Sequence, residues 1–456
     1  MADLNKPKGL KLSTTQIIML SFLVAILMGS LLLSLPISSA DGRGVPYLDA
    51  LFTATTATCV TGLVTVSTAH AWSVFGQIVI LFLIQIGGLG IITVMSGLMI
   101  LLNRKMGIGD RLLIQDAFNL NTLSGLSEFV KKVLIGTFVI EGIGALMYMT
   151  VFVPELGARG IWVSVFNSIS AFCNAGMDII GDTSLCNYAT NPIINLTTSL
   201  LIILGGIGYI VWWDIIRVIG DARGGRRRLF SRLTLHSRIA IIATAVLIIG
   251  GAVLILLFEY NNPATIADLS WFDKIQVALF QSVTTRTAGF ASVPQDNLTD
   301  PTALVSLLLM FIGGSPVGTA GGIKTVTLVV LISSAIANIK GKNEVTLLNR
   351  RVSRSGVEKA AAVCTMAFGI FFASTLLLSA VCDAPLIDVI YETASATATV
   401  GLTRGLTPTL NPIGKLIVIA TMYLGRVGPI SLALALGGNR KSNNLIKNPT
   451  EEISIG

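Results

Sequence analysis

The sequence predicts an all-α membrane protein whose eight transmembrane helices form four parallel helix–pore-loop–helix repeats, with fourfold pseudo-symmetry around a central pore. Three observations lead to this fold class: the composition, a set of long apolar runs, and a short glycine-terminated segment that recurs at a nearly constant interval. Hydrophobic residues make up 53% of the 456 residues and charged residues 12%. Few soluble proteins reach that balance, so most of the chain is expected to lie in a lipid bilayer.

Eight near-uncharged runs are long enough to cross a bilayer, which takes about 20 apolar residues in a helix. Backbone amides and carbonyls find no water in lipid, so each run is predicted to be helical. The first run is longer than the apolar core of a cleaved signal peptide, and we expect it to be retained. The runs lie at about 16–36, 75–102, 133–153, 194–213, 239–258, 304–323, 361–381 and 413–436.

The positions of the basic residues predict the orientation. Lys and Arg gather near the N-terminus, in 103–132, 217–238 and 338–359, and after Gly438. Positively charged loops stay in the cytoplasm, so both termini of this multi-pass cell-membrane protein are expected inside. The net charge of +8 therefore reflects topology, and nucleic acid is not an expected partner. Six bases fall on the outer side: Arg43, Arg159, Lys274, Arg286, Arg404 and Lys415.

Four short segments end in a glycine, and the glycines lie 114, 113 and 112 residues apart. The segments are Leu51–Gly62, Val165–Gly176, Leu279–Gly289 and Ile390–Gly401. An aromatic residue lies nine or ten positions before each glycine: Phe52, Phe166, Phe280 and Tyr391. A fixed period indicates one structural unit used four times. Each segment is too short to cross the membrane and is expected to enter it and return, which requires shelter by protein or a water-filled cavity.

Every unit then begins and ends inside, so the repeats are parallel and enclose a pore, unlike the inverted repeats of many secondary transporters. We expect repeat 1 at 1–103, repeat 2 at 104–217, repeat 3 with a broken last helix at 218–338, and repeat 4 with a short cytoplasmic tail at 339–456. Acids outnumber bases in the outer segments. A vestibule of that charge would concentrate cations; ordinary solvated loop surface is the alternative.

The residues before each glycine are mostly small or carry a hydroxyl group. A dehydrated potassium ion must regain its hydration oxygens, which stacked backbone carbonyls can supply, and glycine permits the backbone angles that such a stretch needs. A single copy would be interpreted as a re-entrant turn or a helix C-cap, but four copies favour a selectivity filter. With one glycine per loop, we expect looser selectivity than in two-glycine filters. The predicted cation-binding residues are Thr58, Cys59, Val60, Thr61, Gly62, Cys173, Asn174, Ala175, Gly176, Thr287, Ala288, Gly289, Ala398, Thr399, Val400 and Gly401.

The segment 313–324 cannot be a continuous helix, because five glycines and a proline interrupt it. We expect a flexible loop below the filter that obstructs ion passage until it moves. A phosphate-binding loop is not predicted, because Ile323 separates Gly322 from Lys324 and the GxxxxGK[ST] pattern fails. The gate residues predicted in this loop are Gly313, Gly314, Ser315, Pro316, Gly318, Thr319, Gly321, Gly322 and Lys324.

Arg426 completes the predicted gate from within the last span. An intramembrane charge is costly and marks a functional site by default; it could form an electrostatic barrier to cations or pair with the loop of repeat 3. Snorkelling to the interface is the alternative. The glycines at 87–90 and 205–208 lie at a matching depth in the last helices of repeats 1 and 2, and close helix packing through small residues is one interpretation of them.

Together these motifs resemble those of the ion-translocating membrane subunits of the Ktr/Trk/HKT superfamily of potassium uptake systems. The start of the chain, without extra helices before the first unit, is more similar to the bacterial Ktr branch. The matching stretches are Thr56–Leu63, Asn167–Ile179, Gln281–Phe290, Gly313–Thr325, Thr393–Gly405 and Leu424–Pro429.

The resemblance implies inward passage of K⁺, with Na⁺ as a second ion, through a homodimer that has one pore in each protomer. It also implies a cytoplasmic ring of nucleotide-binding regulatory subunits. No cytoplasmic segment of this chain has the 50 or so residues of a small domain, so no organic cofactor is expected on it. The basic segments 217–238 and 338–359 are the expected contact faces for the ring; topology charge or attraction to anionic lipid is the alternative.

Two other functions compete. A secondary carrier that couples a solute to a cation would need a charged central site and inverted halves, and the sequence shows neither. A membrane enzyme is not expected, because the two histidines, His70 and His236, fall on opposite predicted faces and no pair of buried carboxylates is evident.

Overall fold

The computed structural model describes residues 13–102, 125–220, 229–342 and 344–428, together with residues 107, 111, 112, 114 and 115. The lysines near the N-terminus, most of the basic residues of 103–124, the run 221–228 and the bases after Gly438 lie outside the described residues. The expectations placed on those segments therefore stay predictions.

Four long helices each begin one of the repeated units: α1 (Thr14–Leu33), α7 (Leu126–Leu156), α12 (Leu235–Glu259) and α16 (Arg354–Val381). Within the described residues, these are the helices that are long and apolar enough to cross a membrane singly. Polar N-cap residues stabilise the starts of these helices. At the start of α1, for instance, the Ser13 hydroxyl accepts a hydrogen bond from the Gln16 amide. Only 17% to 33% of their apolar windows are buried, so most of their surface is free to face lipid.

Four shorter helices follow the long ones: α2 (Tyr47–Cys59), α8 (Ala158–Phe172), α13 (Trp271–Thr284) and α17 (Leu386–Ala398). At 1.5 Å per residue they span roughly 20 Å, less than the roughly 30 Å of a bilayer core. Their aromatic residues (Phe52, Phe166, Phe280, Tyr391) are at most 1% exposed and anchor them in the protein. Asp49, Asp273 and Asp388 lie in the first turns of α2, α13 and α17, where the helix dipole favours an acid.

The last helix of three units is broken. In unit 1, α4 (Val74–Leu89) meets α5 (Ile91–Leu101) at an angle of 99°, and in unit 2, α9 (Pro192–Gly206) meets α10 (Tyr209–Gly220) at 94°. The prediction of continuous helices at 75–102 and 194–213 is therefore wrong. Gly90 and Gly208, at the two bends, have φ of +83° and +95°, which only glycine adopts without strain.

Unit 3 is interrupted where the sequence predicts it. α14 (Asp300–Phe311) ends before the glycine-rich segment, and α15 (Thr325–Ile339) begins after it. Unit 4 ends with α18 (Pro412–Val427), which is continuous over its described length. The remaining elements are the short helices η1 (Pro36–Ser38), α3 (Thr68–Ala71), η2 (Cys186–Tyr188), α11 (Leu229–Arg232), η4 (Gln295–Asn297) and η5 (Thr407–Thr409), and the antiparallel hairpin of β1 (Thr346–Leu347) and β2 (Arg350–Arg351).

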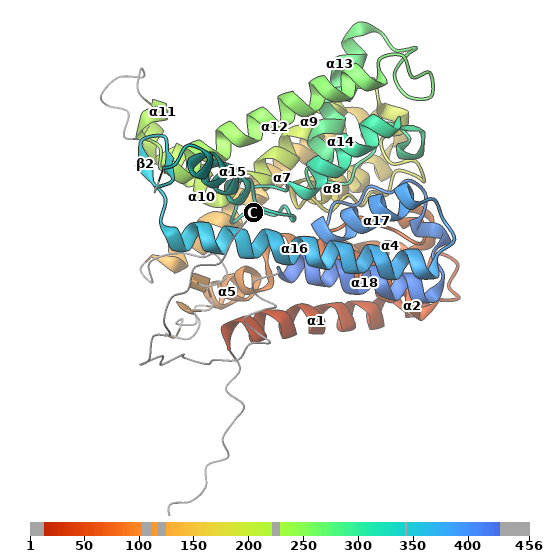
Figure 1. Ribbon diagram of the computed structural model, residues 1–456. Coiled ribbons are helices and arrows are strands. Elements are labelled where there is room, and N and C mark those ends of the chain that lie inside the picture. Colours follow the sequence, from red (N-terminus) through yellow and green to blue (C-terminus); the bar gives the residue numbers. More distant parts are fainter. Residues whose placement is uncertain are drawn as a thin grey trace, which may run out of the picture.

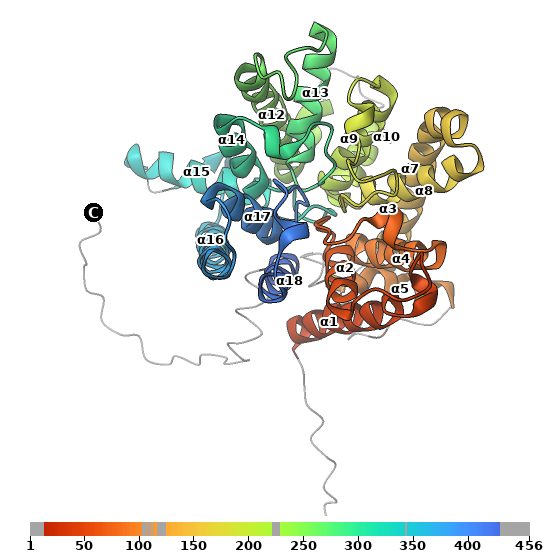
Figure 2. The same ribbon diagram turned by 90° about the vertical axis from the view of Figure 1, so that its right-hand side faces the viewer.

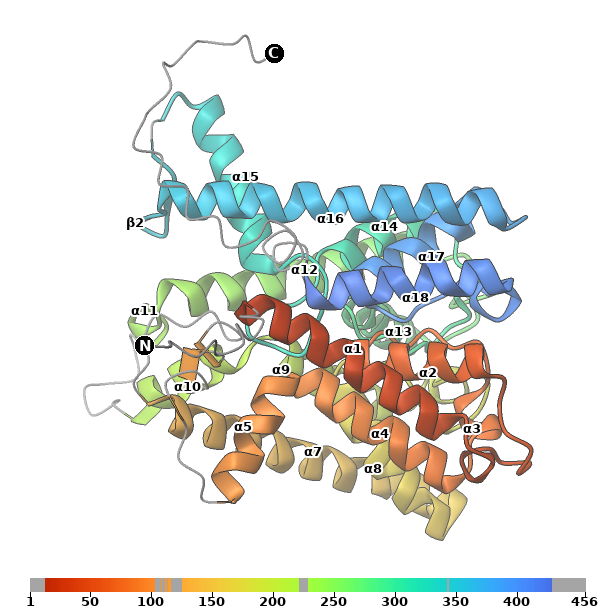
Figure 3. The same ribbon diagram turned by 90° about the horizontal axis from the view of Figure 1, so that it is seen from below.

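The long helices run side by side in Figure 1, with the glycine-terminated segments toward one end of the molecule. Seen along the helices, the four units are arranged around a common centre, and α18 of the last unit packs on α2 of the first (Figure 2). α15 leaves this body at an angle to α16 (Figure 3). The fold thus brings segments about 110 residues apart in the sequence to one central region.

Candidate functional site

The four short helices end in the same backbone turn. The residue two positions before each glycine is left-handed, with φ between +53° and +66°, and the glycine itself has a φ between +64° and +101°. The left-handed residues are Val60, Asn174, Thr287 and Thr399. Non-glycine residues rarely adopt this conformation, so its repetition at equivalent positions shows that the four loops are built alike.

The four glycines form a closed ring. A Cβ atom placed on any of them would meet the carbonyl oxygen that precedes the next glycine, at 2.6 Å in two of the four cases. The pairs are Gly62 with Ala175, Gly176 with Ala288, Gly289 with Val400 and Gly401 with Thr61. The segments that the sequence predicts to converge therefore do so, and no side chain larger than hydrogen fits at these positions.

Hydrogen bonds orient the loop carbonyls. The amides of Thr61, Ala175 and Val400 donate at 2.8 Å to the carbonyls of Thr56, Ser170 and Ser395 in their own helices. The Gly62 and Gly401 amides donate at 2.9 Å to the Thr56 and Ser395 hydroxyls. Because N–H and C=O of a trans peptide point in opposite directions, the carbonyls of these peptides are turned away from the short helices. Unit 3 is looser: the Gly289 amide donates to the Thr284 carbonyl at 3.4 Å.

Two groups of site residues differ in detail from the prediction. Thr58, Cys59 and Ala398 are in the last turns of α2 and α17, and Cys173 caps α8, so three residues follow the helix or its cap up to the glycine in units 1 and 2. In unit 3 the stretch is longer, because α13 ends at Thr284 and is capped by Thr285. The hydroxyl residues that brace the loops were missed. Aligning the four segments on their glycines would have found three of them, since Thr56, Ser170 and Ser395 each lie six residues before a glycine.

The ring forms the floor of an acidic vestibule. A cavity of about 550 Å³ is lined by all four glycines and by Asp178, Asp182 and Asp296, with no Lys or Arg among its described lining residues. Burial raises the pKa of the Asp178 carboxyl to about 6, although hydrogen bonds to it act in the other direction.

Four of the six outer bases are paired with an acid or buried, whereas Arg43 and Arg159 are exposed. Arg404 pairs with Asp388 at 2.8 Å and Lys415 with Asp49 at 2.5 Å, and Lys274 is 8% exposed. Arg286, which the sequence places on the glycine-loop side, lies in the third glycine loop and is buried: its side chain is 7% exposed and donates to the Gly313 carbonyl between α14 and α15 at 3.2 Å.

The segment between α14 and α15 is an ordered loop, and we refer to 312–324 as the intramembrane loop. It is closed at its neck by a bridge between Ile312 and Ile323. Its backbone bonds to the end of α9, through Ser315 N to the Gly206 carbonyl at 2.8 Å and Thr319 N to the Gly205 carbonyl at 3.1 Å. Gly321 lies so close to the Ala398 carbonyl that a Cβ would approach it to 2.6 Å. The loop thus lies directly against the fourth filter loop.

Two cations hold the loop. Arg426 donates from Nη1 to the Thr319 carbonyl at 2.7 Å and from Nη2 to the Gly87 carbonyl of α4 at 2.5 Å. Lys324 folds back, with Nζ 2.5 Å from the Ala320 carbonyl. Both side chains line a second cavity of about 270 Å³, together with Val317 and Gly318 and without any acid among its described lining residues. Of the interpretations of Arg426, pairing with the loop matches this geometry and snorkelling does not.

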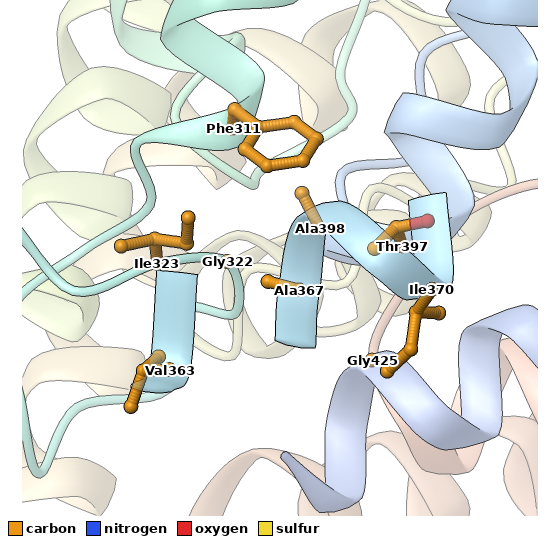
Figure 4. Close-up of a pocket in the computed structure, with 9 residues that line it drawn as sticks. All are labelled: Phe311, Gly322, Ile323, Val363, Ala367, Ile370, Thr397, Ala398 and Gly425. Atoms are coloured by element: carbon orange, nitrogen blue, oxygen red, sulfur yellow. The ribbon is translucent and has the colours of Figure 1, made fainter. Parts of the chain in front are cut away.

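A smaller space lies behind the loop. A cavity of about 30 Å³ separates Gly322 and Ile323 from α16 and the end of α17, with Phe311 above it and Gly425 below (Figure 4). Its lining is apolar apart from Thr397, whose buried hydroxyl has no hydrogen-bond partner within the described structure. The loop therefore packs less tightly toward α16 than toward α9.

Apolar spans, broken helices and a closed ring of four glycine loops on an acid-lined cavity define a helical membrane protein. The chain belongs to the TrkH family, described as cation transport proteins, whose model matches residues 8–445. It is 37% identical over 450 residues to the "Ktr system potassium uptake protein B" of Bacillus subtilis, covering 98% of each chain. It is also 37% identical over 463 residues to the "Potassium/sodium uptake protein NtpJ" of Enterococcus hirae, covering 100% of each.

A solved structure shares the fold. The potassium transporter TrkH of Vibrio parahaemolyticus matches with a TM-score of 0.74 at 18% identity, over 94% of this chain and 86% of that one. At this identity the likeness concerns the fold alone. It supports the helical architecture with broken spans that is described above.

Proposed function

We propose that this chain is the ion-translocating subunit of a potassium uptake system, which passes K⁺, and Na⁺ as a second ion, inward through a carbonyl-lined filter. The observation that carries the proposal is the closed ring of Gly62, Gly176, Gly289 and Gly401 at the floor of the acidic vestibule. The names of the relatives from B. subtilis and E. hirae support it. The transported ions are substrates, and the chain needs no organic cofactor.

In this proposal the eight predicted spans make four repeats, 1–103, 104–217, 218–338 and 339–456, around one pore. The filter consists of the sixteen predicted residues around the four glycines, with both termini in the cytoplasm. Carbonyls turned from the short helices replace the hydration shell of the ion. The vestibule carboxylates raise the local cation concentration.

The intramembrane loop is the gate. Gly313 to Lys324 lie between the filter and the cavity that Lys324 and Arg426 line, and these two positive charges oppose a cation in the pathway. Opening requires the loop to release its bonds to α9 and Arg426. The apolar space toward α16 (Figure 4) is where packing resists such movement least.

The partners follow from the Ktr relationship: a second copy of this chain, and a cytoplasmic ring of nucleotide-binding subunits that acts on the gate. The basic segments 217–238 and 338–359 are the proposed contact faces of the ring. α15, which leaves the helical body next to the second segment (Figure 3), gives such a partner a direct connection to the loop.

The test is to express the chain in cells that lack potassium uptake, with and without the soluble subunit, and to measure K⁺ and Na⁺ entry. K⁺ entry that saturates, depends on Gly289 and increases with the partner supports the proposal. A fixed stoichiometry between the ion and a second solute would instead indicate a secondary cation-coupled carrier. Absence of K⁺ entry in correctly inserted protein would contradict the proposal.

A further inference from the structure

Arg286 is a buried charge without a counter-ion. It follows the C-cap of α13 and precedes Gly289 by three residues, and it is 7% exposed. None of the ion pairs among the described residues includes its guanidinium. Burying such a charge inside a membrane protein costs free energy, so the groups that Arg286 contacts indicate its role.

Among the described residues, its direct hydrogen-bond partner is the start of the intramembrane loop. Arg286 Nη2 donates to the Gly313 carbonyl at 3.2 Å. Gly313 in turn donates its amide to the Ile323 carbonyl at 2.9 Å, and the Gly314 carbonyl accepts the Thr325 amide at 3.0 Å. These bonds close the neck of the loop, so Arg286 holds the point where the loop leaves α14 and returns to α15.

A second contact runs through a small cavity. Arg286 Nε and the Thr244 hydroxyl of α12 are both buried without a hydrogen-bond partner in the described structure. Both residues line a cavity of about 10 Å³, with the Gly206 and Gly314 backbones beside it. That volume is about one water molecule as measured by a 1.4 Å probe, and a polar site of this size ordinarily holds one.

We propose that Arg286 is a positioning residue that couples the third filter loop to the gate. It ties the loop neck directly through the Gly313 carbonyl and ties α12 through one buried water at Thr244. This inference rests on the proposed gating role of the intramembrane loop.

The coupling follows from the position of Arg286 in the chain. It directly precedes Thr287, whose φ of +66° begins the third filter turn. The Gly289 amide of this turn makes a bond of 3.4 Å, longer than the 2.9 Å bonds of the Gly62 and Gly401 amides. When the loop neck moves, the Arg286 guanidinium must move with it or lose its hydrogen bond to the Gly313 carbonyl. Either change can be transmitted to Gly289, because only three residues of backbone separate it from Arg286. A lysine at position 286 would keep the positive charge but would lack the planar guanidinium, whose several N–H groups can donate to two acceptors at once.

The experiment measures loop exposure without using ion flow. Val317 lines the 270 Å³ cavity, so a Val317→Cys variant in proteoliposomes reports how fast a membrane-impermeant maleimide, applied from the cytoplasmic side, reaches the loop. The parent chain with its native cysteines gives the background rate. Arg286→Gln is expected to raise the rate about ten- to a hundredfold, the factor that one charge-assisted hydrogen bond is worth in an equilibrium.

Three companion variants separate positioning from general destabilisation. Arg286→Lys should give a smaller rise, Thr244→Val a smaller rise still, and the exposed Arg159→Gln none. In Arg286→Gln the K⁺/Na⁺ preference should fall together with the rise in labelling. A loss of stability alone would not link these two readouts.

Folded Arg286→Gln protein that keeps the parent labelling rate and K⁺/Na⁺ preference would overturn the proposal. If Arg286→Gln does not fold, parent-like labelling in both Arg286→Lys and Thr244→Val would overturn it equally. Because labelling needs no transport, its outcome is distinct from that of the uptake assay. A chain that moves no K⁺ but shows the expected labelling series would refute the proposed function, while the hold of Arg286 on the loop neck would stand.

Discussion

Arg426 Nη1 lies 2.7 Å from the carbonyl oxygen of Thr319, to which it donates, although 107 residues separate them in the chain. The same guanidinium reaches the Gly87 carbonyl of α4. One side chain of the last helix thus joins the intramembrane loop of unit 3 to the broken helix of unit 1. The guanidinium thereby fastens the loop, and under the proposed function its positive charge also repels a cation below the filter.

Replacing Arg426 with glutamine is expected to increase K⁺ flux per molecule by about tenfold or more. The change removes the charge and weakens at least one charge-assisted hydrogen bond, and each 1.4 kcal/mol is a factor of ten. Tracer uptake into proteoliposomes, normalised to inserted protein, measures the effect, and the exposed Arg159→Gln serves as control. Unchanged flux in a folded Arg426→Gln protein would remove the barrier role.

Replacing Gly289 with serine should weaken the preference for K⁺ over Na⁺ or abolish flux. Gly289 has a φ of +83°, and a Cβ there would overlap the Val400 carbonyl, so backbone strain of about 1–3 kcal/mol and a displaced carbonyl are expected. Competition between the two ions during uptake measures the preference. Gly142→Ser is the matched control, because nothing lies within 4 Å of that position. Equal preference in parent and Gly289→Ser would contradict a filter role for this loop.

External pH should affect uptake through Asp178. With a pKa raised to about 6, the carboxyl is mostly charged at pH 7.5 and mostly neutral at pH 5. Acidification therefore removes negative charge from the vestibule, and the apparent KM for K⁺ should rise while the maximal rate changes little. Asp178→Asn should show the high KM at both pH values. A variant that keeps the full pH dependence would assign the effect to another group.

The Asp49–Lys415 pair should stabilise the contact between the first and last units. Lys415 Nζ is 2.5 Å from Asp49 Oδ1, which also accepts the Thr65 hydroxyl at 2.8 Å. The side chains are only 12% and 17% exposed, so Lys415→Met is expected to cost about 1–2 kcal/mol of unfolding free energy. Unfolding in detergent measures it.

The exposed Glu128–Lys132 pair, with an N–O distance of 2.7 Å, provides the control. Lys132→Met there should change stability by no more than about 0.5 kcal/mol. In a double-mutant cycle, Asp49→Asn should cost less once Lys415 is already replaced. Strictly additive effects would show that the two side chains do not interact.

Periodicity alone located much of the site. The four glycines, the aromatic anchors such as Phe52, and the acids at helix starts recur at equivalent positions, and the structure places the glycines in one ring. The break between α14 and α15 was also predictable, because Pro316 and five glycines cannot continue a helix in any surroundings. These features depend on short-range backbone chemistry, which a single sequence displays directly.

Other features were not predictable from the sequence. Gly90 and Gly208 bend their helices while Gly425 does not, and Arg286 is buried beside its glycine loop. Glycine permits a bend without requiring it, and an arginine is hydrated or buried according to what lies beside it. Both outcomes depend on segments that are distant in the chain; Arg286, for example, meets Gly313, 27 residues away.

The amino-acid sequence by itself determined which segments are apolar helices, where each loop turns and where the third unit breaks, because hydrophobicity and allowed backbone angles are local properties. Only the tertiary structure decided that Arg426 meets Thr319, that Arg286 meets Gly313, and that the carbonyl before one filter glycine faces the next. Contacts of this kind form when four units pack around one centre, and packing selects among partners that local chemistry leaves equivalent.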